Sequence, residues 1–531
     1  MLCETTLCDG DMTQEVADVG QLGALVQSLD RAASEYASRP AVAGRDVNLT
    51  FAQVSEVAEA LARTLKQSGV KPNEPVLVRA SNNAADFAAF FGVWRARGVV
   101  VPLHRLSPPD AVAQVQRKAR ARVEVDIEDV VASPEKWVRP ATAASNNEVS
   151  PERPILEGAA FVIFTSGSTG VPKGVVLSHA AFRGKLGANQ SVLRFSQLDR
   201  TLLVLNDTFS FGIWVGLLTL LSGGLLIIEK RFDANRFVET LVADEISCVG
   251  VVPTMGRLLF ATLDDERLHE GKRALQKAGR LRRMLIGGET LGAELSRKLR
   301  DLIEPAPLYD IYGLTETSTS DFFLLPADYA VHPDSIGRAA PGVQFRIADD
   351  RGREIRSGEV GELLIRSPYL MSGYLHDPAL TEAAFYDKWF RTGDLASVSP
   401  DGFVSLAGRI KEVIVRGGVK VTPGEIEQAA GAYPGVVSAV AVGVEDAVFG
   451  QRIHVLLVPS PRALIEINDV VDFVERRLDK FKWPDAYYAS SELPTGRTGK
   501  LDRGTLREII LSGALKPVGI GRRGASGNPK G

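Results

Sequence analysis

Residues 161–174 read Phe-Val-Ile-Phe-Thr-Ser-Gly-Ser-Thr-Gly-Val-Pro-Lys-Gly. An apolar run of strand length leads into a loop of hydroxyl and glycine residues that ends at Lys173. Glycines let a backbone approach an anion closely, successive amides form a concave nest, and hydroxyls and a lysine donate to phosphate oxygens. A Walker A loop is excluded, because Pro172 and Gly174 stand where that motif needs Gly and Ser or Thr. The stretch predicts a phosphate-binding loop, with a plain surface turn as the alternative.

The sequence before this loop alternates helix and strand. Thr50 and Gln53 fit a capping box that starts a helix. Short apolar strands at 76–78 and 99–103 enclose an apolar helix face, which consists of Phe87, Phe90, Phe91 and Trp94. Strand, helix and strand in about 30 residues make a βαβ unit, the building block of a parallel sheet. We expect the aromatic stripe to be core rather than a ligand site.

After the loop, the pattern of expected secondary structure changes along the chain. Apolar runs of strand length recur at 202–205, 225–228, 248–252 and 284–286. From Ser335 onward, short strands joined by turns are typical of antiparallel β structure. We therefore expect an α/β fold, with a large domain of αβ-layered sheets plus a β subdomain over 1–410. A small mobile α+β domain is expected over 411–515, and a flexible tail over 516–531.

Composition and charge exclude several classes of function. Hydrophobic residues make up 45% of the chain, which excludes intrinsic disorder as the dominant state. The net charge of −3 gives no broad basic field for nucleic acid. Cys3, Cys8 and Cys248 form neither a disulfide framework nor a zinc spacing, and residues 1–20 lack the apolar core of a signal peptide. We expect a cytoplasmic protein without a protein-ligated transition metal.

One uncharged run, at 208–228, is long enough to span a bilayer. Gly223 and Gly224 divide it into a piece of helix length and a short strand. The sequence therefore predicts a buried helix that leads into a buried strand, and no membrane span.

Three further segments are weak evidence of a function when each is taken singly. Residues 310–316 read Asp-Ile-Tyr-Gly-Leu-Thr-Glu, and residues 391–394 read Arg-Thr-Gly-Asp, with Arg409 following. Residues 494–503 present Lys500 on a glycine turn. A helix cap, a salt bridge and a solvated loop would each explain one of them. Together with residues 161–174, and in this order, they resemble the adenylate-forming superfamily of acyl-CoA synthetases, peptide-synthetase adenylation domains and luciferases.

The resemblance implies an ATP site. The β- and γ-phosphates would lie on the loop residues Thr165, Ser166, Gly167, Ser168, Thr169, Gly170 and Lys173. The adenine would be lined by Gly287, Gly288 and Glu289. Its exocyclic amine would donate to Asp310, and its ring would stack on Tyr312, which Gly313 follows. Asp394 would bind the ribose, and Arg409 the ribose or a phosphate.

The resemblance also implies the catalytic groups. Thr315 would touch the α-phosphate, and Glu316 would ligate Mg²⁺, a cation that prefers oxygen. Lys500 would bridge the substrate carboxylate and the α-phosphate, and Lys411 would be the hinge between the two domains. The implied reaction joins a carboxylic acid to AMP with release of pyrophosphate, and then transfers the acyl group to the thiol of coenzyme A.

The acceptor and the acid stay open at this point. The alternative acceptor is the phosphopantetheine arm of a separate carrier protein, and the oligomeric state is not predicted. Gly417 and Gly418 would let a backbone lie against the arm of coenzyme A, although a plain turn explains them nearly as well. A purely binding protein is disfavoured, because the residues matching the family's catalytic groups, Lys500, Glu316 and Asp394, are present.

The expected acyl pocket consists of Phe209, Phe211, Trp214 and Gly287. Members that activate amino acids usually carry an Asp after the Phe, where this chain has Gly212, so an α-amino acid is disfavoured. The string at 209–214 is similar to the aromatic pocket segment of benzoate-type ligases, and the His of many acyl-CoA ligases is lacking here. We expect an aromatic or fatty acid, with the same aromatic residues serving as plain core as the alternative.

We predict that Lys500→Ala sharply reduces adenylate formation and spares the attack of a thiol on a supplied acyl adenylate. The lysine offsets the repulsion between two anions in the first half-reaction only. Pyrophosphate exchange and thioester formation from the synthetic adenylate measure the two steps. Full rates in both would show that the placing of Lys500 is wrong.

Overall fold

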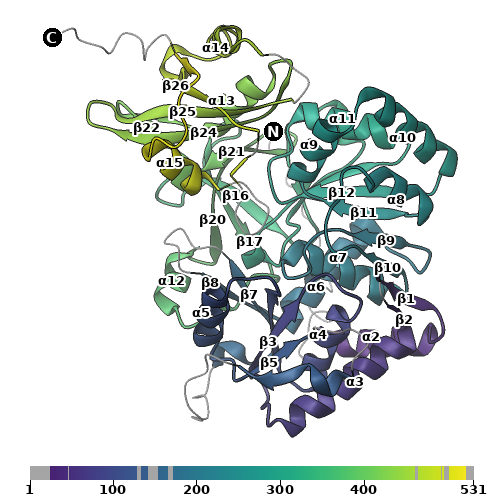
Figure 1. The fold of residues 1–531 in the computed structure, drawn as a ribbon. Coiled ribbons are helices and arrows are strands. Elements are labelled where there is room, and N and C mark those ends of the chain that lie inside the picture. The colour runs from purple at the N-terminus through teal and green to yellow at the C-terminus, as the bar shows by residue number, and fades with distance from the viewer. Residues whose placement is uncertain are drawn as a thin grey trace, which may run out of the picture. The chain divides into compact units, whose positions relative to one another are not determined.

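The computed structural model describes residues 24–45, 47–127, 133–141, 154–165, 172–460, 465–491, 493–494 and 502–521. These form two compact units (Figure 1). The first unit contains the described residues up to Arg231, together with Gly313–Ser320 and Ser367–Ala383. The second contains Phe232–Tyr312, Asp321–Arg366 and the described residues from Ala384 onward. The chain therefore passes from one unit to the other between Tyr312 and Gly313.

A seven-stranded sheet is the centre of the first unit. Its order is β18 (Gly373–Tyr374), β8 (Lys173–Ser178), β7 (Ala159–Thr165), β4 (Val99–His104), β3 (Pro75–Ala80), β5 (Val123–Asp126) and β6 (Val138–Pro140). Strand β3 pairs in parallel with both β4 and β5. The expected βαβ unit is confirmed, because α4 (Asp86–Arg95) connects β3 to β4 and packs on both (Figure 1).

The aromatic stripe of α4 is core, as expected. The side chains of Phe87, Phe90 and Phe91 are fully buried. The ring of Phe161 on β7 lies edge-on to the ring of Trp94, with 5.1 Å between centroids. Buried aromatic side chains contribute more apolar area than other residues, so this contact fixes the helix on the sheet.

Helix α3 (Phe51–Gln67) begins at the predicted capping box. The Thr50 hydroxyl accepts from the Gln53 amide, and the Gln53 side chain accepts from the Thr50 amide. The first unit also contains α2 (Ala24–Glu35), α5 (Pro109–Ala119), α6 (His179–Leu193) and α12 (Pro378–Ala383).

The uncharged run at 208–228 is divided as predicted. It forms α7 (Ser210–Leu221) and β10 (Leu225–Ile228), and Gly223 between them has a φ of 77°. Strand β10 pairs in parallel with β9 (Arg200–Leu203) and with β1 (Pro40–Ala43), which pairs with β2 (Asn48–Thr50). Among the described residues, no helix has the length and apolar character needed to cross a bilayer.

The second unit begins with alternating strands and helices. Strands β11 (Cys248–Val251), β12 (Arg283–Gly287) and β13 (Leu308–Tyr312) are parallel, and β14 (Phe322–Leu324) and β15 (Arg338–Ala339) follow antiparallel. The helices are α8 (Phe237–Ala243), α9 (Pro253–Thr262), α10 (Asp265–Ala278) and α11 (Ala293–Ile303).

The expected β subdomain is an antiparallel sheet. It consists of β16 (Gln344–Ala348), β17 (Gly361–Arg366), β20 (Trp389–Val398), β19 (Phe385–Tyr386) and β21 (Val404–Arg409). The C-terminal α+β part has strands β22 (Ile414–Arg416), β23 (Val419–Val421), β24 (Val436–Asp446), β25 (Gly450–Pro459), β26 (Ala486–Ala489) and β27 (Gly519–Ile520).

The helices of this C-terminal part are α13 (Pro423–Gly431), α14 (Ile467–Glu475) and α15 (Arg503–Leu511). The sequence pattern predicts a helix over about 468–480, whereas α14 ends earlier, at Glu475. The indole Nε1 of Trp483 donates to the Leu478 carbonyl at 2.9 Å, so a turn closes where the helix would have continued.

Two helical glycines, Gly216 at a buried position and Gly187 at an exposed one, give a test of packing. A Cβ on Gly216 of α7 would lie 2.1 Å from the Phe87 ring, whereas a Cβ on Gly187 of α6 would meet nothing within 4 Å. We predict that Gly216→Ala lowers the free energy of unfolding by about 1–3 kcal/mol through overpacking. Gly187→Ala should leave it unchanged or raise it by up to about 1 kcal/mol, because Ala is the better helix former. Urea denaturation measures both, and equal effects would contradict the close packing of α4 and α7.

Candidate functional site

The described ends of the predicted phosphate loop form an antiparallel pair. Strands β7 and β8 pair from Ala159 to Ser178, and Thr165 lies opposite Lys173. Both residues are half-buried. The other residues of the predicted phosphate loop lie outside the described residues, namely Ser166, Gly167, Ser168, Thr169 and Gly170.

Two predicted site residues, Lys173 and Glu316, meet a tyrosine that was not predicted, near the start of β8. Tyr374 of β18 donates its hydroxyl to Glu316 Oε1 at 2.9 Å. The Lys173 ammonium lies over the ring of the same tyrosine, 5.3 Å from its centroid. Burial raises the pKa of Tyr374 above its ordinary value, and the charge of Glu316 raises it further. The tyrosine therefore stays a hydrogen-bond donor and holds the carboxylate of Glu316, so Lys173 and Glu316 are brought to one place.

Thr315 and Glu316 begin a strained turn. After the short 3-10 turn η3 (Thr315–Thr317), the three residues Ser318, Thr319 and Ser320 have φ of 57°, 64° and 59°. Each left-handed non-glycine residue costs roughly 1–2 kcal/mol. A Cβ on Gly313 would lie 2.2 Å from the Ser320 nitrogen, so the turn folds back onto this glycine.

Side chains from other elements hold this turn. The Ser318 hydroxyl donates to the Tyr369 carbonyl at 2.7 Å, and the buried Lys185 ammonium donates to the Ser320 carbonyl at 3.4 Å. The Thr315 and Ser210 hydroxyls lie 3.3 Å apart. Strain of this kind persists only where the surroundings over-determine it. Lys185 and Tyr369 thus support this turn, and no local sequence pattern marks either residue.

A second set of predicted residues meets in the second unit. The Tyr312 hydroxyl, at the end of β13, donates to Asp394 Oδ2 at 2.6 Å. Arg409 Nε lies 2.8 Å from Asp394 Oδ1, because Asp394 of β20 and Arg409 of β21 are register partners. Burial raises the pKa of Asp394, and the Arg409 charge and the Tyr312 hydrogen bond offset part of this effect. Tyr312, Asp394 and Arg409 therefore form one polar cluster.

Asp310 lies on β13, the strand that Tyr312 ends, and Gly287 ends the neighbouring strand β12, with Gly288 directly after it. Asp310 is buried, pairs with Ile286 and Leu324, and has a pKa raised to about 7 by burial. A Cβ on Gly287 would lie 2.3 Å from the Ile311 carbonyl oxygen, so only glycine fits. Gly288 has a φ of 90°.

The side chain of Glu289 is bound by residues of its own unit. Its carboxylate accepts from the Thr254 hydroxyl at 2.8 Å and pairs with Arg257 Nη1 at 3.0 Å. Both partners lie on α9. The carboxylate is therefore held by α9, and any contact with an adenine would come from its backbone or from the other face of the side chain.

The aromatic residues of the expected acyl pocket differ in burial. Phe209 and Phe211 are half-buried, whereas Trp214 is fully buried. The Phe211 and Trp214 rings stack, with 5.4 Å between centroids and 21° between planes. Trp214 is thus core that supports Phe211, and the two phenylalanines keep exposed area.

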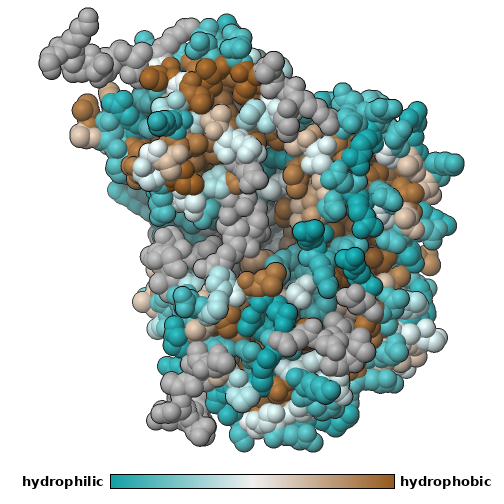
Figure 2. Space-filling view, in the orientation of Figure 1, coloured by the Kyte–Doolittle hydropathy of each residue, from teal (hydrophilic) through white to brown (hydrophobic). Residues whose placement is uncertain are grey.

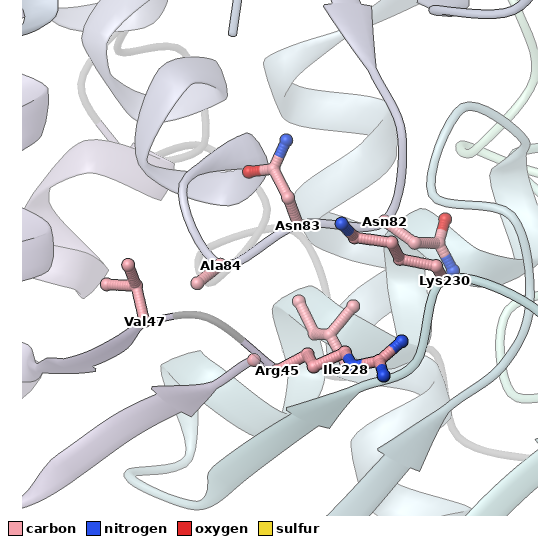
Figure 3. Close-up of a pocket in the computed structure, with 8 residues that line it drawn as sticks. Arg45, Val47, Asn82, Asn83, Ala84, Ile228 and Lys230 are labelled. Carbon is pink, nitrogen blue, oxygen red and sulfur yellow. The ribbon is translucent and has the colours of Figure 1, made fainter. Parts of the chain in front are cut away.

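The first unit also contains a small pocket. Arg45, Asn82, Asn83 and Lys230 are among the residues that line it (Figure 3). None of the predicted site residues lines this pocket.

The expected coenzyme A residues form a hairpin turn. Gly417 and Gly418 have φ of 56° and 81° and join β22 to β23 as a two-residue connection, which requires positive φ at both positions. Val415 and Val448, beside this turn and at the β24–β25 turn, are 45% and 78% exposed. Figure 2 shows apolar surface over this C-terminal part.

The expected hinge residue lies in a short 3-10 turn. Lys411 belongs to η5 (Ile410–Glu412), directly after β21. Arg503 of α15 pairs with Glu412 at 3.3 Å and with Glu427 at 2.6 Å. Lys500 lies outside the described residues.

We predict that Tyr312→Phe weakens ATP binding about tenfold, because a hydrogen bond to a charged group contributes about 1.5–3 kcal/mol. Tyr312→Ala should weaken it further, since the ring is lost as well. Tyr309→Phe is the control, because residue 309 projects to the opposite face of β13. Calorimetric titration with ATP measures all three, and unchanged affinity in Tyr312→Phe would contradict a role for the cluster.

Comparisons with known proteins identify the family. The AMP-binding enzyme family matches residues 29–375, and the AMP-binding enzyme C-terminal domain matches residues 425–500. The indoleacetate–CoA ligase of Aromatoleum aromaticum is 28% identical over 92% of this chain and 98% of its own. The fatty acid–[acyl-carrier-protein] ligase ScoC of Streptomyces coeruleorubidus is 28% identical over 94% and 98%. The ATP-bound structure of MatB from Rhodopseudomonas palustris has a TM-score of 0.78 and 25% identity over 91% and 98%. The chain belongs to the AMP-binding enzyme family.

Proposed function

We propose that the protein is an AMP-forming acid–thiol ligase, which activates a carboxylic acid with ATP and transfers the acyl group to coenzyme A. The observation that carries this proposal is the cluster of Tyr312, Asp394 and Arg409. A buried carboxylate held by a tyrosine and an arginine suits the two hydroxyls of a ribose. Gly313 follows Tyr312 directly and leads to Thr315 and Glu316, so one stretch of chain serves the nucleoside and the phosphates.

The first step is attack of the substrate carboxylate on the α-phosphorus. Negative charge develops on the phosphoryl oxygens, and fixed donors and cations stabilise it. Thr315 supplies a hydroxyl, and Lys173 and Lys500 supply positive charge. Pyrophosphate leaves, and the acyl group is held as a mixed anhydride with AMP.

Glu316 is the residue that would hold Mg²⁺. Among the described residues there is no group of three or more His, Cys, Asp or Glu side chains that could form a complete metal site. Mg²⁺ in such enzymes is usually held by one or two carboxylates and by the substrate phosphates, so a single carboxylate fits. When bound, the ion would neutralise charge on the phosphates.

In the second step a thiol attacks the acyl carbon and AMP leaves. The chain from Lys411 to about residue 515 would act as the small domain whose rotation exchanges Lys500 for the thiol, a hinge motion. Gly417 and Gly418 would lie against the pantetheine arm. The small cysteine content, without a disulfide framework, supports a cytoplasmic location.

The acid is aromatic or fatty. The half-buried Phe209 and Phe211, supported by Trp214, offer apolar area for such a group. The relatives named for indoleacetate and for a fatty acid support these two classes. The carrier-protein ligase among them keeps transfer to a phosphopantetheine arm as the second candidate.

An acid panel tests the proposal. We predict pyrophosphate exchange that depends on an aryl or fatty acid and is absent with α-amino acids. We predict AMP release that coenzyme A increases, because the thiol removes the bound adenylate. Release increased by a pantetheinylated carrier protein and not by coenzyme A would favour the second candidate. No acid-dependent exchange with any of these acids would contradict the activity.

A further inference from the structure

A buried ion pair lies at the base of the hairpin that carries Gly417 and Gly418. Arg416 Nη2 donates to Asp485 Oδ1 at 2.5 Å, and the two side chains are 5% and 4% exposed. Arg416 Nη1 donates to the Trp483 carbonyl oxygen at 2.7 Å. The guanidinium therefore joins β22 to the segment that leads into β26.

The carboxylate of Asp485 is fixed by a neighbouring strand. Its Oδ2 accepts from the Ile453 amide at 2.8 Å, and the Asp485 amide donates to the Ile453 carbonyl at 2.7 Å. Strands β22, β25 and β26 are neighbours in one sheet (Figure 1). Asp485 thus ties Arg416 to β25 and β26, and all three strands belong to the same compact unit.

The backbone of the hairpin meets β25 beside the pair. Arg416 lies opposite Gly450, and the Gly417 amide donates to the Phe449 carbonyl at 2.7 Å. In the part of the chain that the structure describes, a Cβ on Gly417 or Gly418 would meet no heavy atom within 4 Å beyond the adjacent residues. The pair therefore fixes the residue directly before the two glycines and leaves their backbone open to a slender ligand.

Apolar side chains lie beside this open backbone. Val419 is the register partner of Arg416, and the Arg416 guanidinium carbon lies 5.8 Å from the centroid of the Phe449 ring. Val419 and Phe449 are each 42% exposed. A pantetheine arm alternates alkyl and amide groups, so apolar side chains next to an open backbone suit it.

The energetics of the pair favour a role in geometry. Two charges buried together contribute little net stability, because the loss of hydration offsets most of their attraction. The planar guanidinium donates in two fixed directions at once, whereas a lysine ammonium is a point charge on a flexible stem. An arginine at position 416 thus sets the direction in which the hairpin leaves the sheet, which neither a lysine nor an apolar side chain would do.

We propose that Arg416 and Asp485 position the β22–β23 hairpin for the attack of the thiol, and that adenylate formation does not depend on them. The inference rests on the proposed function, which places the pantetheine arm against Gly417 and Gly418. Arg416 and Asp485 are positioning residues, since they act through the backbone of the hairpin.

The test separates the two half-reactions in the full chain. Arg416→Lys keeps the charge but not the fork, and Asp485→Asn keeps the shape but not the charge. In both variants we expect KM for coenzyme A to rise about fivefold or more, and thioester formation from a synthetic acyl adenylate to slow about tenfold. The adenylate used is that of the acid giving the fastest pyrophosphate exchange. Exchange without coenzyme A should change by less than about twofold.

Two further variants separate positioning from stability. Val440→Ala leaves a cavity in the same C-terminal part, at a buried residue opposite Leu456, whereas the pair meets β25 at Gly450 and Ile453. Its KM for coenzyme A should stay within about twofold of that of the unchanged protein. Arg416→Met combined with Asp485→Leu removes both charges and keeps the site packed, so it serves where a single variant does not fold. It should raise KM for coenzyme A as the single variants do.

Hydrogen exchange at the Gly417 amide tests the anchoring without any substrate. We expect a peptide spanning residues 414–421 to exchange about tenfold faster in Arg416→Lys and in the double variant than in the unchanged protein. Unchanged exchange of this peptide would overturn the anchoring. Faster exchange with an unchanged KM for coenzyme A would overturn the role in thiol attack, and so would an equal loss in both half-reactions. If the unchanged protein forms no thioester with any acid, the proposed function fails and the positioning role with it, while the hydrogen exchange still decides the anchoring.

Discussion

A buried carboxylate, Asp394, holds together the cluster that we propose to bind the ribose. It joins β20 to β21 through Arg409 and joins both to the end of β13 through Tyr312. Taking this carboxylate out of water is unfavourable unless donors replace the lost hydration. The cluster supplies such donors, and it fixes three segments that are far apart in the chain.

The turn that follows β13 is likewise an unfavourable local structure that contacts around it maintain. Three consecutive non-glycine residues in the left-handed region are unfavourable by themselves, and the contacts of Lys185 and Tyr369 maintain them. The strained residues follow closely after Thr315 and Glu316, which we propose to contact the phosphates. A site that is held in one geometry before its substrate arrives loses less free energy on ordering when the substrate binds.

The sequence predicted the elements better than their contacts. The βαβ unit, the capping box at Thr50, the division at Gly223 and the antiparallel subdomain all follow from local periodicity and turn residues, and the structure agrees with each. Asp394 and Arg409 were paired through the family resemblance rather than through their spacing. The Glu316–Tyr374 hydrogen bond joins residues 58 apart, and no local pattern marks it. The left-handed turn was missed because its residues are Ser, Thr and Ser, where glycine is the usual signal.

The order of the chain through the two compact units has a consequence for any attempt to dissect the protein. The backbone changes unit after Arg231, Tyr312, Ser320, Arg366 and Ala383. A single proteolytic nick or a truncation at one of these points releases neither unit whole, because each draws on stretches from both sides of the cut. Neither unit is therefore a contiguous fragment that one gene truncation would yield.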